Sequence, residues 1–347
     1  MKRLATTPRI LLLLACCLQA GFAAGADRVR IFVAGPEQSV QALMARDIAR
    51  HVARAADIEM DIRTVAGTPA ALLRLPETGA LQMAMLQADA AQAYAGAALR
   101  GNPDASRMIG PVRIVAQLHE EEIHFVVRSD SPMNNLHDLA QARINLGPMH
   151  GGAALTVAAL YRLLFSSPIP EALASFLSNE DALVKLITEQ TIDAVAIVAP
   201  RPAKLLADMK PEARRFVKLL KFDASQPGAE AALKIYTATA IPAATYPNLL
   251  SGDLPALSVR IYLVASGHGE KNEAILARFA AAWCRNLPRI GAEGHAKWAG
   301  IEPAPPPLAT GWIHARTAER EIRACIDGTP PPPETCELEN RLLGLCR

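Results

Sequence analysis

The sequence has few aromatic residues and no large excess of positive or negative charge. After residue 26 it also has no long apolar run. Aromatic residues make up 5% of the 347 residues, and the formal net charge is +2. Nucleic-acid-binding proteins carry a basic face or stripe, so we expect no nucleic-acid partner. No later segment reaches the ~20 apolar residues of a membrane-spanning helix. The chain does have 51% hydrophobic and 20% charged residues, which is typical of domains with packed cores.

Sequence motifs of the common enzyme classes are also missing. The chain contains no Gly-x-Ser-x-Gly turn, phosphate-binding loop or dinucleotide fingerprint. The segment HEEEIH comes nearest to a zinc-protease motif, which needs two histidines four residues apart on one helix face. His119 and His124 are five apart and flank a predicted strand start, where an odd separation directs side chains to opposite faces. We therefore predict no catalytic residue, no metal and no cofactor, in a protein that is not an enzyme.

The first 26 residues are typical of a secretory signal peptide. MKRLATTPR supplies positive charge, residues 10–20 are apolar, and Ala24, Gly25 and Ala26 form a small-residue cleavage site. In an alternative interpretation, residues 13–16 form a lipoprotein box in which Cys16 is acylated. Both interpretations predict an exported protein that works in the periplasm.

Cysteine is scarce, and its distribution agrees with export. Four cysteines lie beyond the predicted signal, at Cys284, Cys325, Cys336 and Cys346. An even number in an oxidising compartment predicts two disulfides, with three possible pairings. We predict Cys325–Cys336 and Cys284–Cys346; the alternative is that one pair stays reduced. No two of them have the C-x-x-C spacing of a zinc or redox site.

Short strand-like and helical segments alternate along the chain, which predicts an α/β fold with mostly parallel sheets. Two such series, connected by strand crossings near Ile123 and Ser258, predict two lobes with a ligand cleft between them. We place lobe one at residues 28–118 with 266–328, lobe two at 119–265, and a tail containing proline and cysteine at 329–347. The predicted strands are residues 28–35, 58–65, 81–87, 112–118, 123–128, 192–198 and 258–265, and the main helices are 36–56, 89–99, 151–165 and 270–286.

The order of these segments resembles the TAXI-type solute-binding receptors of tripartite ATP-independent periplasmic (TRAP) transporters over roughly residues 29–300. After an opening strand that enters a helix, the matching pieces are MAMLQADAAQAY, QLHEEEIHFVVRSDSPMNNLHDL, INLGPMHGG, IDAVAIVAPRP and IPAATYPNL. The resemblance implies a type II periplasmic binding protein fold that closes on a small carboxylate or amino acid. It also implies a monomer that presents this solute to a TRAP-type membrane permease. In the alternative, a module of the same fold binds or senses a ligand without serving transport.

In this fold a ligand meets strand ends and helix N-termini at the cleft. Arg201 is suited to pair with a carboxylate, or else is an exposed charge at a helix start. Tyr94 and Tyr246 offer a hydroxyl and an apolar wall, or else are core residues with satisfied hydroxyls. The predicted ligand-binding residues are Gly35, Ser39, Gln87, Tyr94, His150, Gly151, Arg201 and Tyr246.

Several positions depart from the family's pattern where the ligand would bind. The first turn, rich in glycine and threonine in the family, is VAGPEQSV here. Pro36 has no N–H, and Glu37 places a negative charge at the positive end of the predicted helix. The second turn, usually Gly-Ser-Gly-Thr, is PMHGGA, and Ala88 and Ala244 replace a family serine and glycine. We therefore expect a solute that is larger, less anionic or cationic.

Overall fold

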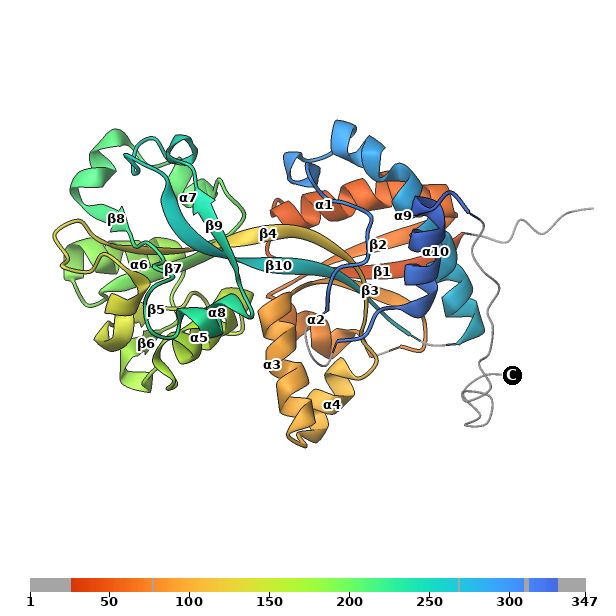
Figure 1. The fold of residues 1–347 in the computed structure, drawn as a ribbon, viewed down its shortest axis with the longest axis horizontal. Coiled ribbons are helices and arrows are strands. Elements are labelled where there is room, and N and C mark those ends of the chain that lie inside the picture. The colour runs from red at the N-terminus through yellow and green to blue at the C-terminus, as the bar shows by residue number, and fades with distance from the viewer. Residues whose placement is uncertain (1–25, 77, 268, 309–311, 330–347) are drawn as a thin grey trace, which may run out of the picture.

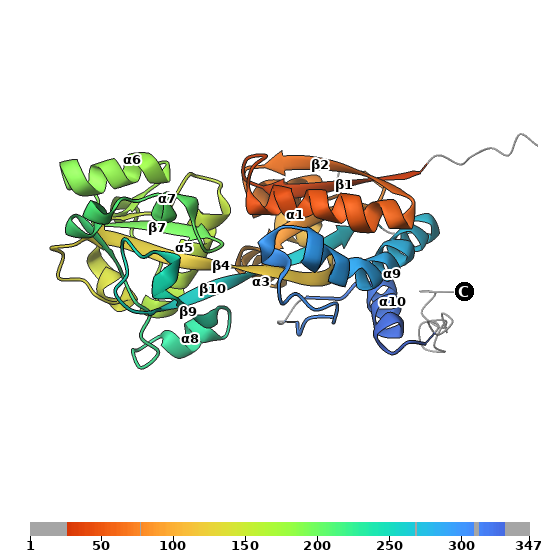
Figure 2. The same cartoon turned by 90° about the horizontal axis from the view of Figure 1, so that it is seen from above.

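The computed structural model describes residues 26–329 except 77, 268 and 309–311. Two lobes are joined by two long antiparallel strands, β4 (Arg113–Arg128) and β10 (Leu254–Ser266) (Figure 1). Seen from above, both strands pass from one lobe into the other (Figure 2). Nearly all of the predicted signal peptide and tail, with Cys16, Cys336 and Cys346, lies outside the described residues. Of the helices that the structure describes, none is both long and apolar enough to span a bilayer.

Lobe one is built from the first part of the chain and from its last two α-helices. Its strands are β1 (Asp27–Ala34), β2 (Ile58–Val65) and β3 (Gln82–Gln87), and β1 pairs in parallel with the other two. These spans match the predicted strands closely. The helices are α1 (Val40–Ile48), α2 (Thr68–Arg74), α3 (Ala88–Leu99), α4 (Pro103–Ile109), α9 (Glu270–Glu293) and α10 (Arg316–Ile326), with a π turn at Ala49–Ala53 and 3-10 turns at Arg54–Ala56 and Ala296–Trp298.

Lobe two is built from the middle of the chain and has shorter elements. Its strands are β5 (Ile144–Asn145), β6 (Ala174–Ser175), β7 (Ala194–Ala199), β8 (Val217–Leu219) and β9 (Thr237–Ile241). Its helices are α5 (Gly152–Phe165), α6 (Asn179–Val184), α7 (Lys204–Ala207) and α8 (Ala229–Leu233). A π turn at Lys185–Glu189 and 3-10 turns at Leu136–Gln141, Glu171–Leu173, Pro211–Arg215 and Ala243–Thr245 complete it.

One sheet runs through both lobes in the order β2-β1-β3-β10-β4-β7-β5-β6, with β9 added to β10 and β8 to β4. Each lobe buries hydrophobic side chains on both faces of this sheet. In lobe one, Trp283 and Trp298 lie in one core and Phe32 in the other. In lobe two, Phe125 and Tyr246 belong to separate cores. The predicted α/β fold, with two lobes joined by crossing strands, is confirmed.

The acidic segment at the crossing is itself strand, and the prediction that it separates two strands was wrong. β4 continues through Glu120, Glu121 and Glu122 because each carboxylate has partners. Glu120 contacts two side chains of β10, Glu121 accepts hydrogen bonds from two glutamines, and Glu122 pairs with an arginine. Buried carboxylates are tolerated when they are hydrogen-bonded or paired. Register shifts between β4 and β10 accompany this segment.

The helix predicted for residues 36–56 begins later than expected. α1 starts at Val40, and the Ser39 hydroxyl accepts a hydrogen bond from the backbone N–H of Ala42 at 3.3 Å. Ser39 is therefore the N-cap. Glu37 lies exposed in the preceding turn and not in the first turn of the helix, as we had placed it. In the same lobe, α9 runs past its predicted end to Glu293.

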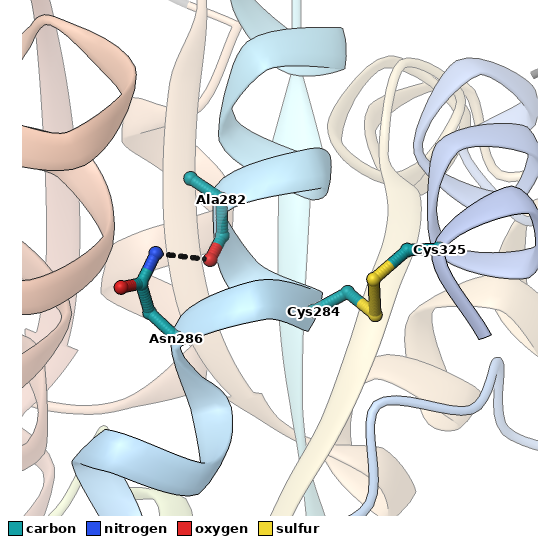
Figure 3. The surroundings of a disulfide bond; sticks show 4 residues. All are labelled: Ala282, Cys284, Asn286 and Cys325. Atoms are coloured by element: carbon teal, nitrogen blue, oxygen red, sulfur yellow. Dashed lines mark hydrogen bonds between the residues drawn. A yellow bond between two sulfur atoms is a disulfide. The ribbon is translucent and has the colours of Figure 1, made fainter. Parts of the chain in front are cut away.

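The disulfide joins Cys284 to Cys325, so both predicted pairings were wrong (Figure 3). α9 and α10 pack against each other, and this brings the two Cα atoms to 6.4 Å. That separation is within the range that a disulfide requires. The pairing follows from helix packing across 41 residues of sequence, which spacing alone does not reveal.

Candidate functional site

A cavity of about 390 Å³ lies between the two lobes, and we call it the cleft cavity. Lobe one contributes the turn into α1 and the end of β3, and lobe two contributes the start of α5 and the loop from β7 to α7. Helix starts present backbone N–H groups that have no partner inside the helix. The residues that matter most for the cavity's chemistry are Gly35, Ser39, Gln41, Gln87, Glu121 and Gly152.

Glu121 places a carboxylate in the wall of the cleft cavity, and 6% of the residue is exposed. Its Oε1 accepts a hydrogen bond from Gln41 Nε2 at 3.1 Å, and its Oε2 accepts one from Gln87 Nε2 at 3.0 Å. Gln41 is itself oriented, because its Oε1 accepts a hydrogen bond from the backbone N–H of Ala34 at 3.0 Å. The two amides therefore direct their N–H groups at the carboxylate and fix its position.

The two lobes are in contact beside Gln87, and the absence of side chains at Gly67 and Gly152 allows this contact. A Cβ atom at Gly152, the first residue of α5, would lie 1.8 Å from Gln87 Oε1. A Cβ atom at Gly67 of lobe one would lie 2.6 Å from the backbone nitrogen of Gly152. Heavy atoms do not approach so closely, so a side chain at either position requires movement of the opposite lobe or of Gln87. The cleft is therefore in a closed arrangement.

A buried hydrogen bond also crosses between the lobes. Tyr236 of lobe two contacts Asp89 Oδ2, at the start of α3, at 2.9 Å and the carbonyl oxygen of Thr156 at 3.1 Å. A carbonyl oxygen only accepts, and a hydroxyl has one proton, so a protonated Asp89 satisfies both contacts. Burial raises the pKa of the Asp89 carboxyl, and its hydrogen bonds offset this only in part. Both observations favour a protonated Asp89 in the closed arrangement.

Comparison with known protein families identifies the family of this chain. The family model described as "NMT1-like family" matches residues 38–273. The chain belongs to the NMT1-like family. Within the curated proteins, nothing matches the sequence.

Among solved structures, this NMT1-like protein is similar to a TctC solute-binding protein from Polaromonas, with 15% identity, coverage of 88% of this chain and 99% of that chain, and a TM-score of 0.42. MatC from Rhodopseudomonas palustris with bound malate has 18% identity, coverage of 86% and 98%, and a TM-score of 0.45. The arginine-, lysine- and histidine-binding protein ArtJ from Geobacillus stearothermophilus has 12% identity, coverage of 80% and 97%, and a TM-score of 0.43.

The structure places Arg201 of the NMT1-like protein outside the cleft cavity. Its Nε atom lies 3.2 Å from Glu122 Oε1, and its Nη1 donates to the carbonyl oxygen of Ala240 at 2.7 Å. Its backbone N–H donates to Glu122 Oε2 at 2.6 Å. The guanidinium lines a second, larger cavity of about 640 Å³, which we call the outer cavity, together with Glu120 and Lys297. Glu122 therefore forms the ion pair with Arg201 that we had expected a ligand carboxylate to form.

Tyr246 is a core residue of lobe two, 1% exposed, with its hydroxyl fully engaged. The hydroxyl accepts from the backbone N–H of Ala203 at 2.8 Å and lies 3.0 Å from His124 Nε2. His124 Nδ1 lies 3.1 Å from the carbonyl oxygen of Ile197, so Nδ1 carries the proton and Nε2 accepts from Tyr246. Burial lowers the pKa of His124 to about 4, which keeps the ring neutral.

The other predicted ligand-binding residues divide into two groups. Gly35, Ser39 and Gln87 line the cleft cavity, and Gly151 immediately precedes its wall at Gly152. Tyr94 packs against the core on the α2 and α3 side of the sheet, and His150 is exposed in the turn before α5. Neither of these two contributes to the cleft cavity.

Sequence reasoning missed Gln41 and Glu121, which hold the polar centre of the cavity. The acidic run of Glu120, Glu121 and Glu122 was a usable signal, because it interrupts a strand with apolar segments on both sides, but the sequence does not distinguish Glu121 from its two neighbours. Gln41 carried no signal, because a glutamine at the start of a helix is usually solvated. Among the residues that the structure describes, no cluster of three or more His, Cys, Asp and Glu side chains is arranged to hold a metal ion.

Proposed function

We propose that this NMT1-like protein is an extracytoplasmic solute-binding receptor of a TRAP-type transporter. It captures a small organic solute between its lobes and presents it, as a monomer, to a membrane permease. The observation that carries the proposal is the cleft cavity, which is lined by helix starts of both lobes and by Glu121 of the crossing strand β4. Its volume of about 390 Å³ suits a small molecule.

The contacts between the lobes support a cleft that opens and closes. Gly67 packs against Gly152, and Tyr236 is hydrogen-bonded to Asp89. These contacts can separate, whereas the strands β4 and β10 run continuously from one lobe into the other. Two strands that cross between compact lobes are a suitable hinge, because small changes in their twist rotate one lobe against the other. A solute enters the open form, and closure surrounds it.

The proposal is tested by thermal unfolding of the purified mature protein in the presence of carboxylates, amino acids and amines. A solute at 100 times its Kd stabilises the folded state by about 2.7 kcal/mol, which raises the melting temperature measurably. Isothermal titration calorimetry then gives the affinity, and X-ray scattering shows whether the solute compacts the protein. Failure of every solute class to raise the melting temperature would contradict a receptor role. Uptake of the solute into vesicles that depends on both this protein and a TRAP-type permease tests the transport step.

A further inference from the structure

The charges around the cleft cavity are unequal. Among the described residues that line it, Glu121 and Lys204 are the ionisable ones. The Lys204 side chain is 88% exposed and pairs with Asp208 one turn along α7. The buried charge of this cavity is therefore the carboxylate of Glu121.

The hydrogen bonds to Glu121 do not neutralise it. Both come from uncharged glutamine amides. The nearest basic group is the His119 ring, whose Nε2 lies 3.7 Å from Glu121 Oε1; this is ion-pair distance, too long for a hydrogen bond, and the ring carries a charge only when it is protonated. A carboxylate accepts about four hydrogen bonds, so the two amide contacts leave acceptor capacity on Glu121, which lines the cavity. A buried negative charge of this kind is stabilised by a cation that enters the cavity.

The helix starts do not reverse this polarity. A helix N-terminus carries about half a positive charge, which is less than the charge of one carboxylate. At α5, the amide oxygen of Gln87 already stands against Gly152. That orientation is fixed, because the nitrogen of the same amide donates to Glu121. A solute carboxylate would have to displace Gln87 and approach Glu121.

We propose that the cleft selects a small solute bearing a protonated amine, and that Glu121 is the residue that binds the ammonium group. The inference rests on the proposed receptor function and names the chemistry of its solute. The ammonium donates to the carboxylate of Glu121, while Gln41 and Gln87 hold that carboxylate in place. Closure of the lobes then removes water from the ion pair and strengthens it.

The first test uses the wild-type protein and matched solutes, measured by calorimetry: putrescine against butanediol, and amino acid amides against the corresponding hydroxy amides. We expect the amine member of a pair to bind and its amine-free counterpart to bind about a hundredfold more weakly. Equal or tighter binding of the amine-free members overturns the inference and leaves the receptor function standing. If neither class binds, and the wider solute panel also fails, the receptor function itself is contradicted.

The second test uses Glu121→Gln, which keeps the shape and one acceptor oxygen but removes the charge. We expect about a hundredfold loss of affinity for the amine. The matched control is Glu120→Gln, the adjacent residue, which faces the outer cavity and should leave the affinity unchanged. An affinity of Glu121→Gln within twofold of the wild type overturns the assignment. Thermal unfolding checks that both variants fold. If a variant does not fold, the comparison of matched solutes on the wild-type protein decides whether the cleft selects an amine.

Discussion

Replacing Gly67 by alanine is expected to hold the two lobes apart. The new Cβ would lie 2.6 Å from the backbone nitrogen of Gly152 and 3.1 Å from the carbonyl carbon of Gly151, both in the opposite lobe. These are backbone atoms, which cannot rotate away as the end of a side chain can. The backbone at Gly67 is extended, with a φ of 169°, so alanine adopts it without strain. The substitution therefore acts on the contact between the lobes and leaves lobe one intact.

The size of the effect follows from the overlap. Separation of the methyl group from the opposite backbone to ordinary contact requires a shift of roughly 1 Å. Overpacking of this kind costs about 1–3 kcal/mol. Since about 1.4 kcal/mol corresponds to a tenfold change in affinity, a solute that needs the closed form should bind about tenfold to a hundredfold more weakly.

X-ray scattering and calorimetry measure the two consequences. The ligand-free Gly67→Ala protein should have a larger radius of gyration than the wild type, and the affinity for any solute that binds the wild type should fall. Gly79→Ala is the matched control in the same lobe, because a Cβ atom there meets nothing within 4 Å. Unchanged scattering together with unchanged affinity in Gly67→Ala would show that the lobes do not close through this contact.

Two further predictions concern stability. Cys284→Ser removes a cross-link between residues that are 41 apart, and this should lower the free energy of unfolding by about 4 kcal/mol. Reduction of the wild-type protein should have the same effect, and urea unfolding at neutral pH measures both. Equal unfolding midpoints with and without reductant would refute this. Burial holds the pKa of His124 at about 4 in the folded protein against 6.5 when unfolded, so the unfolded chain binds the extra proton between these values. Stability should therefore fall by about 3 kcal/mol as the pH drops from about 6.5 through 4, and His124→Asn should show a shallower pH dependence in this window. Parallel pH profiles for variant and wild type would contradict the assignment of a neutral, buried ring.

The local elements of the fold were largely readable from the sequence. The alternation of Ile58, Met60 and Ile62 with polar residues predicts β2, and the spans of β1 and β3 follow from similar patterns. The start of α2 at Thr68 follows from the proline after it. These features depend on neighbours in the chain, so a one-dimensional pattern is sufficient to find them. The order of such elements also predicted the two lobes.

The acidic run on β4 shows where sequence reasoning stops. Glu120, Glu121 and Glu122 are consecutive and chemically identical, yet the structure turns them to different surroundings. Glu120 meets β10, Glu121 enters the cleft cavity, and Glu122 pairs with Arg201. Which carboxylate faces the cavity depends on the register between β4 and β10, which shifts beside this segment. A shift of one residue exchanges the two faces of a strand.

The sequence by itself therefore determined the kinds of element, their order and the predicted export signal, because these depend on residues close together in the chain. The tertiary structure decided the partners. It paired Cys284 with Cys325, placed Tyr246 in a core and not at the cleft, and brought Gln41 and Gln87 to Glu121. Each of these contacts joins residues that are at least 34 positions apart. Such contacts form only when whole elements pack, and no local pattern encodes them.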